Sequence, residues 1–281
     1  MNYFQTLKFG SKKLKLNDIN THILDSELLL SYALNLQREQ VLTNLDAKIK
    51  KSRFNFFKKL LHRRQKKEPI AYIINKKEFW KNNFYVNRDV LIPRPETEII
   101  VEEILKFIKP NSSKSLLDVG TGSGCIIISI IKERLNCLAT AIDISKKALN
   151  IARFNAKMHH LINKINFVNI DIDKIQDNKY DFIISNPPYI KKLNLSKLDD
   201  SVKLFEPYIA LEAGIDGLRE IKKIIKKSNK LLKRNGKLIF EIGEYQSMNV
   251  KNILNDNGYY INKVVNDISS VPRVIISTKI N

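Results

Sequence analysis

A glycine-rich turn is the first segment of this sequence whose residue types could do chemistry. An apolar run at residues 116–117 leads through Asp118 into a turn made of Gly120, Thr121, Gly122, Ser123 and Gly124. Glycine permits positive φ and a close approach of the backbone to a ligand, and the N-terminus of a following helix would point at that ligand. On its own the turn indicates a ligand site only weakly, because a tight structural corner or a dinucleotide loop has the same composition.

An acid at the end of the next apolar run narrows the class of ligand. Asp143 lies about 20 residues beyond Gly124, where an ionised carboxylate can accept hydrogen bonds from both hydroxyls of a ribose. The turn lacks the Gly-Lys-Ser/Thr of a phosphate loop, and its glycine spacing is tighter than that of a dinucleotide loop. The two features together predict an adenosine ligand. Asp118 either faces the amino group of an amino-acid-bearing cofactor or hydrogen-bonds the turn itself.

A proline-rich segment further along offers a second kind of chemistry. Asn186, Pro187, Pro188 and Tyr189 follow another apolar run, and the carboxyl ends of such strands are where open α/β sheets bind ligands. A residue before proline is extended and proline has no N–H, so carbonyl oxygens are presented here without competing donors. An ordinary Pro-Pro turn is the alternative explanation.

These acceptors suit methyl transfer to a planar amide nitrogen, which is a poor nucleophile because its lone pair is delocalised. The side-chain oxygen of Asn186 and the carbonyl oxygen of Pro187 could each accept one N–H and aim the lone pair at a sulfonium methyl group, while Tyr189 packs on the flat group. Positioning of this kind can contribute about 7–11 kcal/mol, and no general base is required before transfer. We therefore predict Asn186, Pro187 and Tyr189 as catalytic residues.

The elements that precede these segments read as a helical bundle and a linker. Residues 1–75 show helical periodicity at 24–36 and again from Ser52 until Pro69 stops the helix, and the stretch 48–67 holds ten Lys or Arg residues and no acid. Residues 70–92 predict a β-hairpin with the polar pair Asn82 and Asn83 at its turn. A helix is expected at 96–108, after Arg94 between two prolines.

From residue 115 onward, strands and helices are expected to alternate, which implies an α/β fold with a mostly parallel sheet covered on both faces. The first five expected strands lie at 115–119, 138–143, 166–171, 180–185 and 237–241. Two more, at 259–266 and 272–278, are too close together for a crossover helix, so they should form an antiparallel hairpin at the sheet edge.

The composition limits the class of protein. The chain has 281 residues, two cysteines, four histidines and a formal net charge of +20. Neither the cysteines nor the histidines have metal-ligand spacing, so we predict no metal. No apolar run approaches the roughly 20 residues of a membrane span and no secretory signal begins the chain, so we expect a cytoplasmic protein with no membrane partner. The charge favours acidic partners and proximity to ribosomes or RNA, although A/T-rich coding gives the same bias; we expect no stable nucleic-acid partner.

Together these segments resemble the HemK/PrmC family of protein-glutamine methyltransferases, which act on peptide chain release factors. The resemblance covers nearly all of residues 68–280. Besides the glycine turn and Asn-Pro-Pro-Tyr-Ile at 186–190, it rests on Glu-Pro-Ile-Ala-Tyr-Ile at 68–73, Glu-Phe-Trp at 78–80, Leu-Ile-Pro-Arg-Pro-Glu-Thr-Glu at 91–98, Phe-Glu-Pro at 205–207, Asp-Gly-Leu at 216–218, Glu-Ile-Gly at 241–243 and Gln246.

The resemblance implies a seven-stranded Rossmann-like class I methyltransferase sheet in a domain at 76–281, joined by the hairpin linker to the bundle at 1–75, which would recognise the release factor. It implies S-adenosylmethionine as methyl donor, S-adenosylhomocysteine as product, and the glutamine of a Gly-Gly-Gln motif as acceptor. The implied cofactor residues are Asp118, Gly120, Thr121, Gly122, Ser123, Gly124, Asp143, Asp171, Ile172 and Asn186. The implied substrate residues are Arg94, Asn186, Pro187, Pro188 and Tyr189.

Three positions depart from the family pattern, and some alternatives stay open. Ile172 stands where relatives commonly have an aromatic residue, and Asn75 and Ala213 stand where they usually have glycine. Arg94 either borders the active site or only starts a helix. A glutamine of a ribosomal protein, or an exocyclic amine of adenine or guanine in nucleic acid, poses the same chemical problem as a release-factor glutamine. A non-catalytic protein that binds ribosomes or RNA through its charge is a further alternative, which the intact glycines, Asp143 and Asn-Pro-Pro-Tyr oppose.

Overall fold

The computed structural model describes residues 1–176 and 179–280, and it divides into two compact units. The first unit comprises residues 1–76 together with 199–205, and the second comprises the remainder of the chain. None of the helices in the described residues combines the length and the apolar character needed to cross a membrane.

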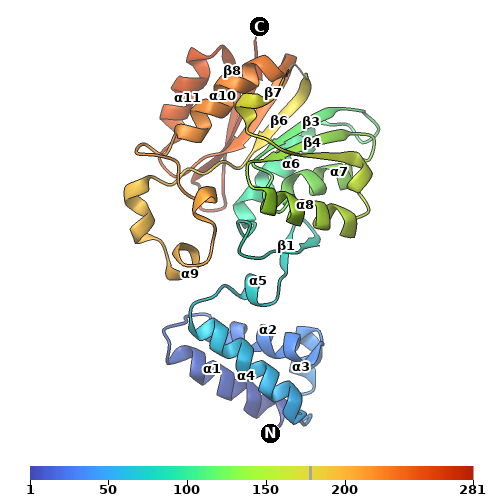
Figure 1. The fold of residues 1–281 in the computed structure, drawn as a ribbon, viewed down its shortest axis with the longest axis vertical. Helices are drawn as coiled ribbons and strands as arrows, with labels where there is room; N and C mark the ends of the chain where they lie inside the picture. The colour runs from blue at the N-terminus through green and yellow to red at the C-terminus, as the bar shows by residue number, and fades with distance from the viewer. Residues whose placement is uncertain (177–178, 281) are drawn as a thin grey trace. The chain divides into compact units, whose positions relative to one another are not determined.

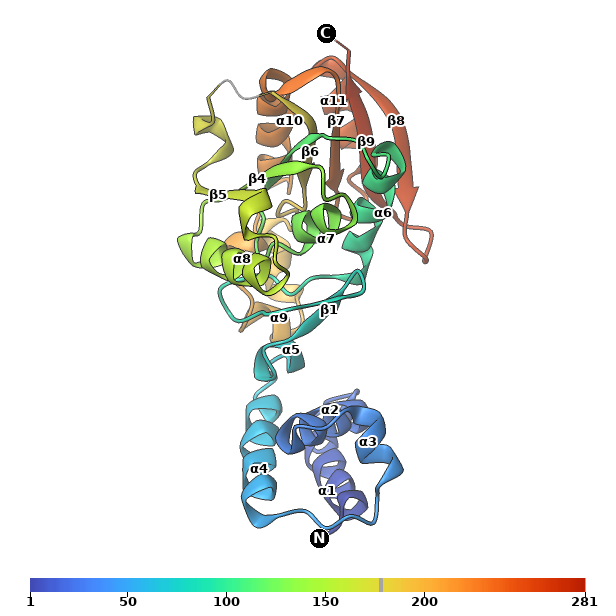
Figure 2. The ribbon, with the colours of Figure 1, turned by 90° about the vertical axis from the view of Figure 1, so that its right-hand side faces the viewer.

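The first unit is a small helical bundle, and its helices α1 to α4 are drawn in shades of blue in Figures 1 and 2. Its helices are α1 (Tyr3–Lys15), α2 (His22–Leu34), α3 (Arg38–Thr43), α4 (Lys51–Gln65) and α5 (Ile70–Ile73), and α9 (Asp200–Lys203) belongs to the same unit. Gly10 lies where α1 meets its neighbours: a Cβ there would lie 2.4 Å from Ser26 Oγ and 2.6 Å from Phe57 Cζ. Close helix packing therefore requires a glycine at this position.

The second unit contains a seven-stranded sheet in the order β5-β4-β3-β6-β7-β9-β8. The strands are β3 (Ser115–Val119), β4 (Leu138–Asp143), β5 (Ile165–Asn169), β6 (Tyr180–Ser185), β7 (Leu232–Glu241), β8 (Tyr259–Asn266) and β9 (Pro272–Lys279). Strands β3 to β7 pair in parallel, whereas β9 is antiparallel to both of its neighbours, so β8 and β9 form the edge drawn in red in Figure 2. The predicted α/β class and antiparallel edge are confirmed.

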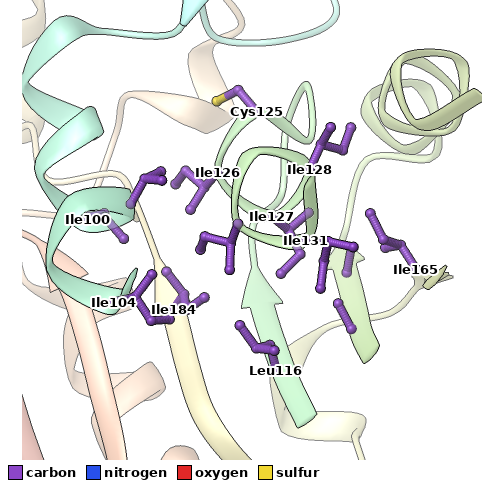
Figure 3. Close-up of a cluster of buried hydrophobic side chains, with 14 of the residues drawn as sticks. Ile100, Ile104, Leu116, Cys125, Ile126, Ile127, Ile128, Ile131, Ile165 and Ile184 are labelled. Carbon is purple, nitrogen blue, oxygen red and sulfur yellow. The ribbon is translucent and has the colours of Figure 1, made fainter. Parts of the chain in front are cut away.

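Helices cover both faces of this sheet (Figure 1). One face carries α6 (Glu98–Phe107), α7 (Cys125–Glu133) and α8 (Lys146–Met158), and the other carries α10 (Arg219–Leu231) and α11 (Ser247–Asp256). An apolar core lies between the sheet and the helices on each face. In the core on the α7 side, Figure 3 shows Ile127 and Ile131 of α7 directed toward strand residues such as Leu116. Short 3-10 helices at Pro95–Thr97 (η1), Ile162–Lys164 (η2), Ile172–Lys174 (η3), Lys192–Lys197 (η4) and Tyr208–Ala210 (η5) complete the unit.

The predicted turn of the linker hairpin is wrong by two residues. Strands β1 (Lys77–Phe79) and β2 (Asn82–Phe84) pair so that Trp80 and Lys81 form the turn, with φ of 44° and 61°. Asn82 lies in the strand instead, where its side chain donates to the Trp80 carbonyl at 2.7 Å. The buried rings of Phe79 and Phe84 pack edge to face, and this tertiary contact sets the register in preference to the turn propensity of asparagine.

Two smaller differences follow from local backbone conformation. The helix expected at 96–108 begins as the 3-10 turn η1, and regular helix starts only at Glu98. Asn75 has φ of 54°, a left-handed conformation that asparagine tolerates better than most residues.

Candidate active site

A cavity of about 300 Å³ opens at the carboxyl ends of β3, β4 and β6. It lies where β3 has β4 on one side and β6 on the other, the switch point at which open α/β sheets bind ligands. Of the predicted site residues, its wall contains Arg94, Gly120, Thr121, Gly122, Ser123, Asp143, Asp171, Ile172, Asn186, Pro187 and Pro188. Asp118, Gly124 and Tyr189 lie outside this wall.

The glycine turn is built as its composition predicts. Gly120, Gly122 and Gly124 have φ of 71°, 55° and 81°, and the amides of Gly120 and Thr121 both donate to the Ile142 carbonyl, at 2.9 and 3.0 Å. A Cβ on Gly120 would meet no atom within 4 Å, so only its backbone conformation and the open cavity favour glycine there. A Cβ on Gly124 would lie 2.8 Å from Ile128 Cδ1, so that glycine serves helix packing.

Asp118 is fully buried beneath the turn. Its Oδ2 accepts a 2.6 Å hydrogen bond from the Thr121 hydroxyl, whereas Oδ1 has no hydrogen-bond partner among the described residues. Burial raises the pKa of Asp118 to about 7, although the hydrogen bond from Thr121 opposes the shift. The carboxyl group therefore holds the turn with one oxygen and keeps the other free for a donor.

Asp143 is held by backbone amides at the end of β4. Its Oδ2 accepts from Gly122 N at 3.0 Å and its Oδ1 accepts from Ser145 N at 2.8 Å. Burial raises the pKa of this carboxyl, while the two amides act in the opposite direction. Each carboxylate oxygen has a second lone pair, so the pair of oxygens can still accept from a diol in the cavity.

Asp171, in the cavity wall after β5, already has a partner for each of its carboxylate oxygens. Its Oδ1 accepts from Asp173 N at 3.0 Å, and its Oδ2 pairs with the Lys223 ammonium. Burial raises the pKa of Asp171, but Lys223 outweighs this effect and the net pKa is lowered. Nothing in the sequence had drawn attention to Lys223, because the contact joins η3 to α10 across the fold. Ile172, beside Asp171, is buried and presents an apolar surface.

The Asn-Pro-Pro-Tyr segment follows β6 directly, and only the nitrogen of the Asn186 side-chain amide is hydrogen-bonded within the described residues. Asn186 Nδ2 donates to Thr97 Oγ1 at 3.0 Å, and among the described residues none donates to Asn186 Oδ1. Thr97 in turn donates to Glu241 Oε2 at 2.6 Å, and the Tyr189 hydroxyl lies 3.3 Å from Glu241 Oε1. Thr97 and Glu241 are buried, whereas Asn186 and Tyr189 are partly exposed.

Glu241 and Thr97 are site residues that belong to the motifs of the sequence but had no predicted role. Burial raises the pKa of Glu241 to about 7, with the hydrogen bonds from Thr97 and Tyr189 opposing the shift. Burial and the neighbouring Glu241 together raise the pKa of the Tyr189 hydroxyl. The signal that could have drawn attention to Glu241 is its place: an acid directly after the apolar run at 238–240, at the end of a strand.

Two further contacts brace the same segment. Gln246 Nε2 donates to the carbonyls of Gly217 and Tyr189 at 2.9 and 3.2 Å, and Gln246 Oε1 accepts from Gly243 N at 2.9 Å. Arg94 pairs with Glu206, whose other oxygen accepts from Ile92 N at 3.2 Å. These contacts give the Phe-Glu-Pro, Asp-Gly-Leu and Glu-Ile-Gly motifs a common purpose, which is to hold the loops around the cavity.

Comparison with known proteins identifies the family. The model of the PrmC N-terminal domain matches residues 5–74, and that of the methyltransferase small domain matches residues 97–202. The release factor glutamine methyltransferase of Buchnera aphidicola subsp. Baizongia pistaciae is 38% identical over 97% of this chain and 98% of that protein. The one from Clostridium acetobutylicum is 37% identical over 91% of this chain and 90% of that protein. The chain belongs to the release factor glutamine methyltransferase family.

Other matches extend this comparison. The bifunctional methyltransferase of Rickettsia felis is 37% identical over 99% of this chain but only 58% of that protein, so the chain spans little more than half the length of such relatives. Among solved structures, a methyltransferase from Pyrococcus furiosus (TM-score 0.52, 18% identity, 70% of this chain and 89% of that one) has the same fold. The hMettl16 catalytic domain has it too, with TM-score 0.54 and 19% identity over 70% of this chain and 76% of that one. The predicted family and methyltransferase fold are confirmed, while the roles of single residues stay predictions.

Proposed function

We propose that this chain transfers the methyl group of S-adenosylmethionine to the side-chain amide nitrogen of the Gly-Gly-Gln glutamine in a peptide chain release factor. The single observation that carries the proposal is the one-sided hold on Asn186, whose Nδ2 is committed to Thr97 while its Oδ1 remains available beside the cavity. Membership of the release factor glutamine methyltransferase family agrees with it.

The residues around the glycine turn fit S-adenosylmethionine. The free Oδ1 of buried Asp118 suits an ammonium donor, and the Asp143 oxygens suit the two ribose hydroxyls. The apolar side chain of Ile172 suits the face of a base, whereas Asp171 would share its carboxylate with Lys223. When bound, the cofactor would supply a methyl group on a positively charged sulfur and would leave as S-adenosylhomocysteine.

The chain's own residues would act on the acceptor amide by holding it. The Asn186 Oδ1 and the Pro187 carbonyl each accept one N–H of the glutamine, which disfavours delocalisation of the nitrogen lone pair and directs it toward the methyl group. The nitrogen loses one proton to solvent as the new bond forms. Tyr189 lies behind the cavity wall, so its support in this state is to fix the end of the segment through Glu241. Positioning of this kind is worth at most about 7–11 kcal/mol.

The first unit and the basic charge bear on the partner. We assign recognition of the release factor to residues 1–75, whose family model is the PrmC N-terminal domain, and we place the reaction in the cytoplasm, where release factors act. Helix α4 carries much of the basic run, including Lys58 and Lys59, and Lys66 follows the helix directly. An acidic face on the release factor would suit this surface.

Methyl transfer from labelled S-adenosylmethionine to a purified release factor tests the proposal. Parallel reactions contain the glutamine-to-alanine variant of its Gly-Gly-Gln motif, a ribosomal-protein mixture, duplex DNA or rRNA. Label on the intact release factor and not on its variant supports the proposal. Label on a ribosomal protein or on nucleic acid would replace the substrate class while leaving the cofactor and amide chemistry in place.

A further inference from the structure

Three polar groups in series, the last two of them buried, lead away from the proposed methyl-acceptor position. The amide of Asn186 donates to the hydroxyl of Thr97, and that hydroxyl donates to the carboxylate of Glu241, over distances of 3.0 and 2.6 Å. Thr97 is 2% exposed and Glu241 is 1% exposed. Because Thr97 and Glu241 are this deeply buried, the direction of the hydrogen bond between them depends mainly on the chain's own donors and acceptors.

The direction of the series follows from the chemistry of its last member. An ionised carboxylate has only acceptors, so the single hydrogen of the Thr97 hydroxyl must point to Glu241. The Thr97 oxygen can then only accept from Asn186, and the Asn186 group that faces it must be the NH₂. The opposite face of the amide, toward the cavity, must therefore be the Oδ1.

The second oxygen of the same carboxylate holds the other end of the segment. Glu241 Oε1 lies 3.3 Å from the Tyr189 hydroxyl, so one buried carboxylate is joined to both the first and the last residue of Asn-Pro-Pro-Tyr. The carboxylate comes from the end of β7, which pairs with β6 immediately before this segment. The pairing of β6 with β7 therefore brings Glu241 next to the Asn-Pro-Pro-Tyr segment.

We propose that Glu241, acting through Thr97, is a positioning residue that orients the Asn186 amide with its oxygen toward the methyl acceptor. The inference rests on the proposed function, because the orientation matters only if the acceptor is an N–H donor. With the amide reversed, the Asn186 NH₂ would face another NH₂ and the clamp would lose an acceptor. Glu241 lies outside the cavity wall, and Thr97, although in that wall, acts in this scheme through the Asn186 amide.

The ionisation of Glu241 controls the direction of the series. A protonated Glu241 could donate to Thr97, the Thr97 hydrogen would then be free to point to Asn186, and the amide could reverse. Burial raises the pKa of Glu241 to about 7, with Glu96 acting in the same direction and Thr97, Tyr189 and Arg273 acting against it. Arg273 is itself paired with Asp267 at 2.8 Å. The active orientation is therefore expected above this pH, and reversal is expected below it.

A pair of substitutions at Thr97 separates orientation from packing. Thr97→Ser keeps the hydroxyl, whereas Thr97→Val keeps the shape and removes it. We expect Thr97→Val to lower kcat on the release factor roughly 10–100-fold with KM and cofactor affinity nearly unchanged, and Thr97→Ser to stay within about threefold of wild type. Thr140→Val on β4, outside the cavity wall, is the matched control and should leave kcat unchanged. Equal kcat in the Val and Ser variants would overturn the proposal.

An Asn186→Asp background distinguishes orientation from a general loss of support. An aspartate has an oxygen at both terminal positions, so its orientation needs no setting, and Thr97→Val should cost much less there than in the wild-type background. Thermal unfolding of each variant checks that it is folded. A Thr97→Val loss of the same size in both backgrounds would show that Thr97 only supports packing.

A measurement without substrate keeps this inference separate from the proposed function. In the ¹⁵N spectrum of the wild-type protein, the Asn186 side-chain NH₂, assigned through its absence in Asn186→Asp, should exchange slowly with solvent because one hydrogen is bonded to buried Thr97. Thr97→Val should remove this protection and Thr97→Ser should retain it. Unprotected Asn186 in the wild type would refute the relay even if the release factor is methylated. Protection without methylation would instead refute the proposed substrate.

Discussion

The cavity has two halves, and each is backed by a buried carboxyl whose pKa is raised to about 7. Asp118, on the glycine-turn side, has one oxygen bonded to Thr121 and one without a partner among the described residues. Glu241, on the Asn-Pro-Pro-Tyr side, has both oxygens occupied by Thr97 and Tyr189. The two buried acids thus differ in their partners: Asp118 has an oxygen without a hydrogen-bond partner among the described residues, whereas each oxygen of Glu241 is joined to a neighbouring side chain.

The two halves also differ in the sequence distance over which they are built. The contacts of Asp118 and Asp143 come from residues within one β-α-β stretch of chain, and Thr121 is only three positions from Asp118. Thr97 is 144 positions from Glu241 and 89 from Asn186. A local segment therefore shapes the half that we propose for the cofactor. The half that we propose for the methyl acceptor depends on strands and loops that meet only in the folded protein.

Removing the Asn186 side-chain amide should reduce turnover and leave cofactor binding nearly unchanged. Asn186→Ala deletes an acceptor that contacts the reacting amide, so kcat should fall about 10²–10³-fold. Cofactor affinity should change by only a few-fold, because the glycine turn and Asp143 are untouched. Turnover of labelled substrate and calorimetric titration with S-adenosylmethionine measure the two effects. Unchanged turnover would remove the amide clamp from the mechanism.

Substitution of Asp118 should instead weaken the binding of the cofactor. In Asp118→Asn the free oxygen loses its charge, which should weaken binding of S-adenosylmethionine by roughly 10–150-fold, the equivalent of about 1.5–3 kcal/mol for a charge-assisted hydrogen bond. Calorimetric titration measures the change, and Thr140→Val is the control. Wild-type affinity in Asp118→Asn would mean that Asp118 serves the turn alone.

The ionised Asp118 carboxylate that we expect to favour cofactor binding should destabilise the cofactor-free protein. The pKa of Asp118 in the fold, about 7, lies above its ordinary value of 3.8, so the fold favours the neutral form. The free energy of unfolding should therefore decline by up to about 4 kcal/mol as pH rises from about 4 to 7, and Asp118→Asn should remove this part of the decline. Urea titrations at several pH values, compared between wild type and variant, measure it. A decline of equal slope in both would assign it to other groups such as Glu241.

The pH profile of turnover should report on Glu241. If the ionised form sets the Asn186 amide, kcat should fall as pH drops through about 7 and should be roughly tenfold lower one unit below that point. Glu241→Gln should have low turnover and lack this acid limb, because its side chain does not titrate. A wild-type profile that is flat between pH 6 and 8 would contradict a role for ionisation.

The smallest effect is expected from the brace behind the segment. Gln246→Leu leaves the carbonyls of Gly217 and Tyr189 without their donor, which should lower the free energy of unfolding by about 1–3 kcal/mol and turnover only severalfold. Chemical denaturation and steady-state kinetics measure these changes. A loss of cofactor affinity larger than the loss of turnover would show that the two halves are coupled through Gln246.

The linker hairpin shows how far local patterns reach. Aromatic and polar alternation at residues 77–84 predicted the hairpin, but the Phe79 and Phe84 contact moved the turn from Asn82 and Asn83 to Trp80 and Lys81. The same limit applies at the site: Asp171 was visible as an acid after a strand, but its pairing with Lys223 was not. Burial of Phe79 and Phe84 in the core of the second unit, and charge pairing between Asp171 and Lys223, are contacts that a short window of residues does not contain.

The sequence by itself determined the parts whose backbone is locally constrained. Glycine spacing, an acid at a strand end and a residue before two prolines each constrain the backbone within a few residues. The residue types alone therefore predicted that the turn, Asp143 and Asn186 lie at the carboxyl edge of the sheet, where the cavity is found. Only the tertiary structure decided which way the Asn186 amide faces, that one oxygen of Asp118 has no partner among the described residues and that Glu241 is joined to both Thr97 and Tyr189. These properties depend on which donors reach a buried acceptor, and strand pairing and loop packing bring those donors together from distant parts of the chain.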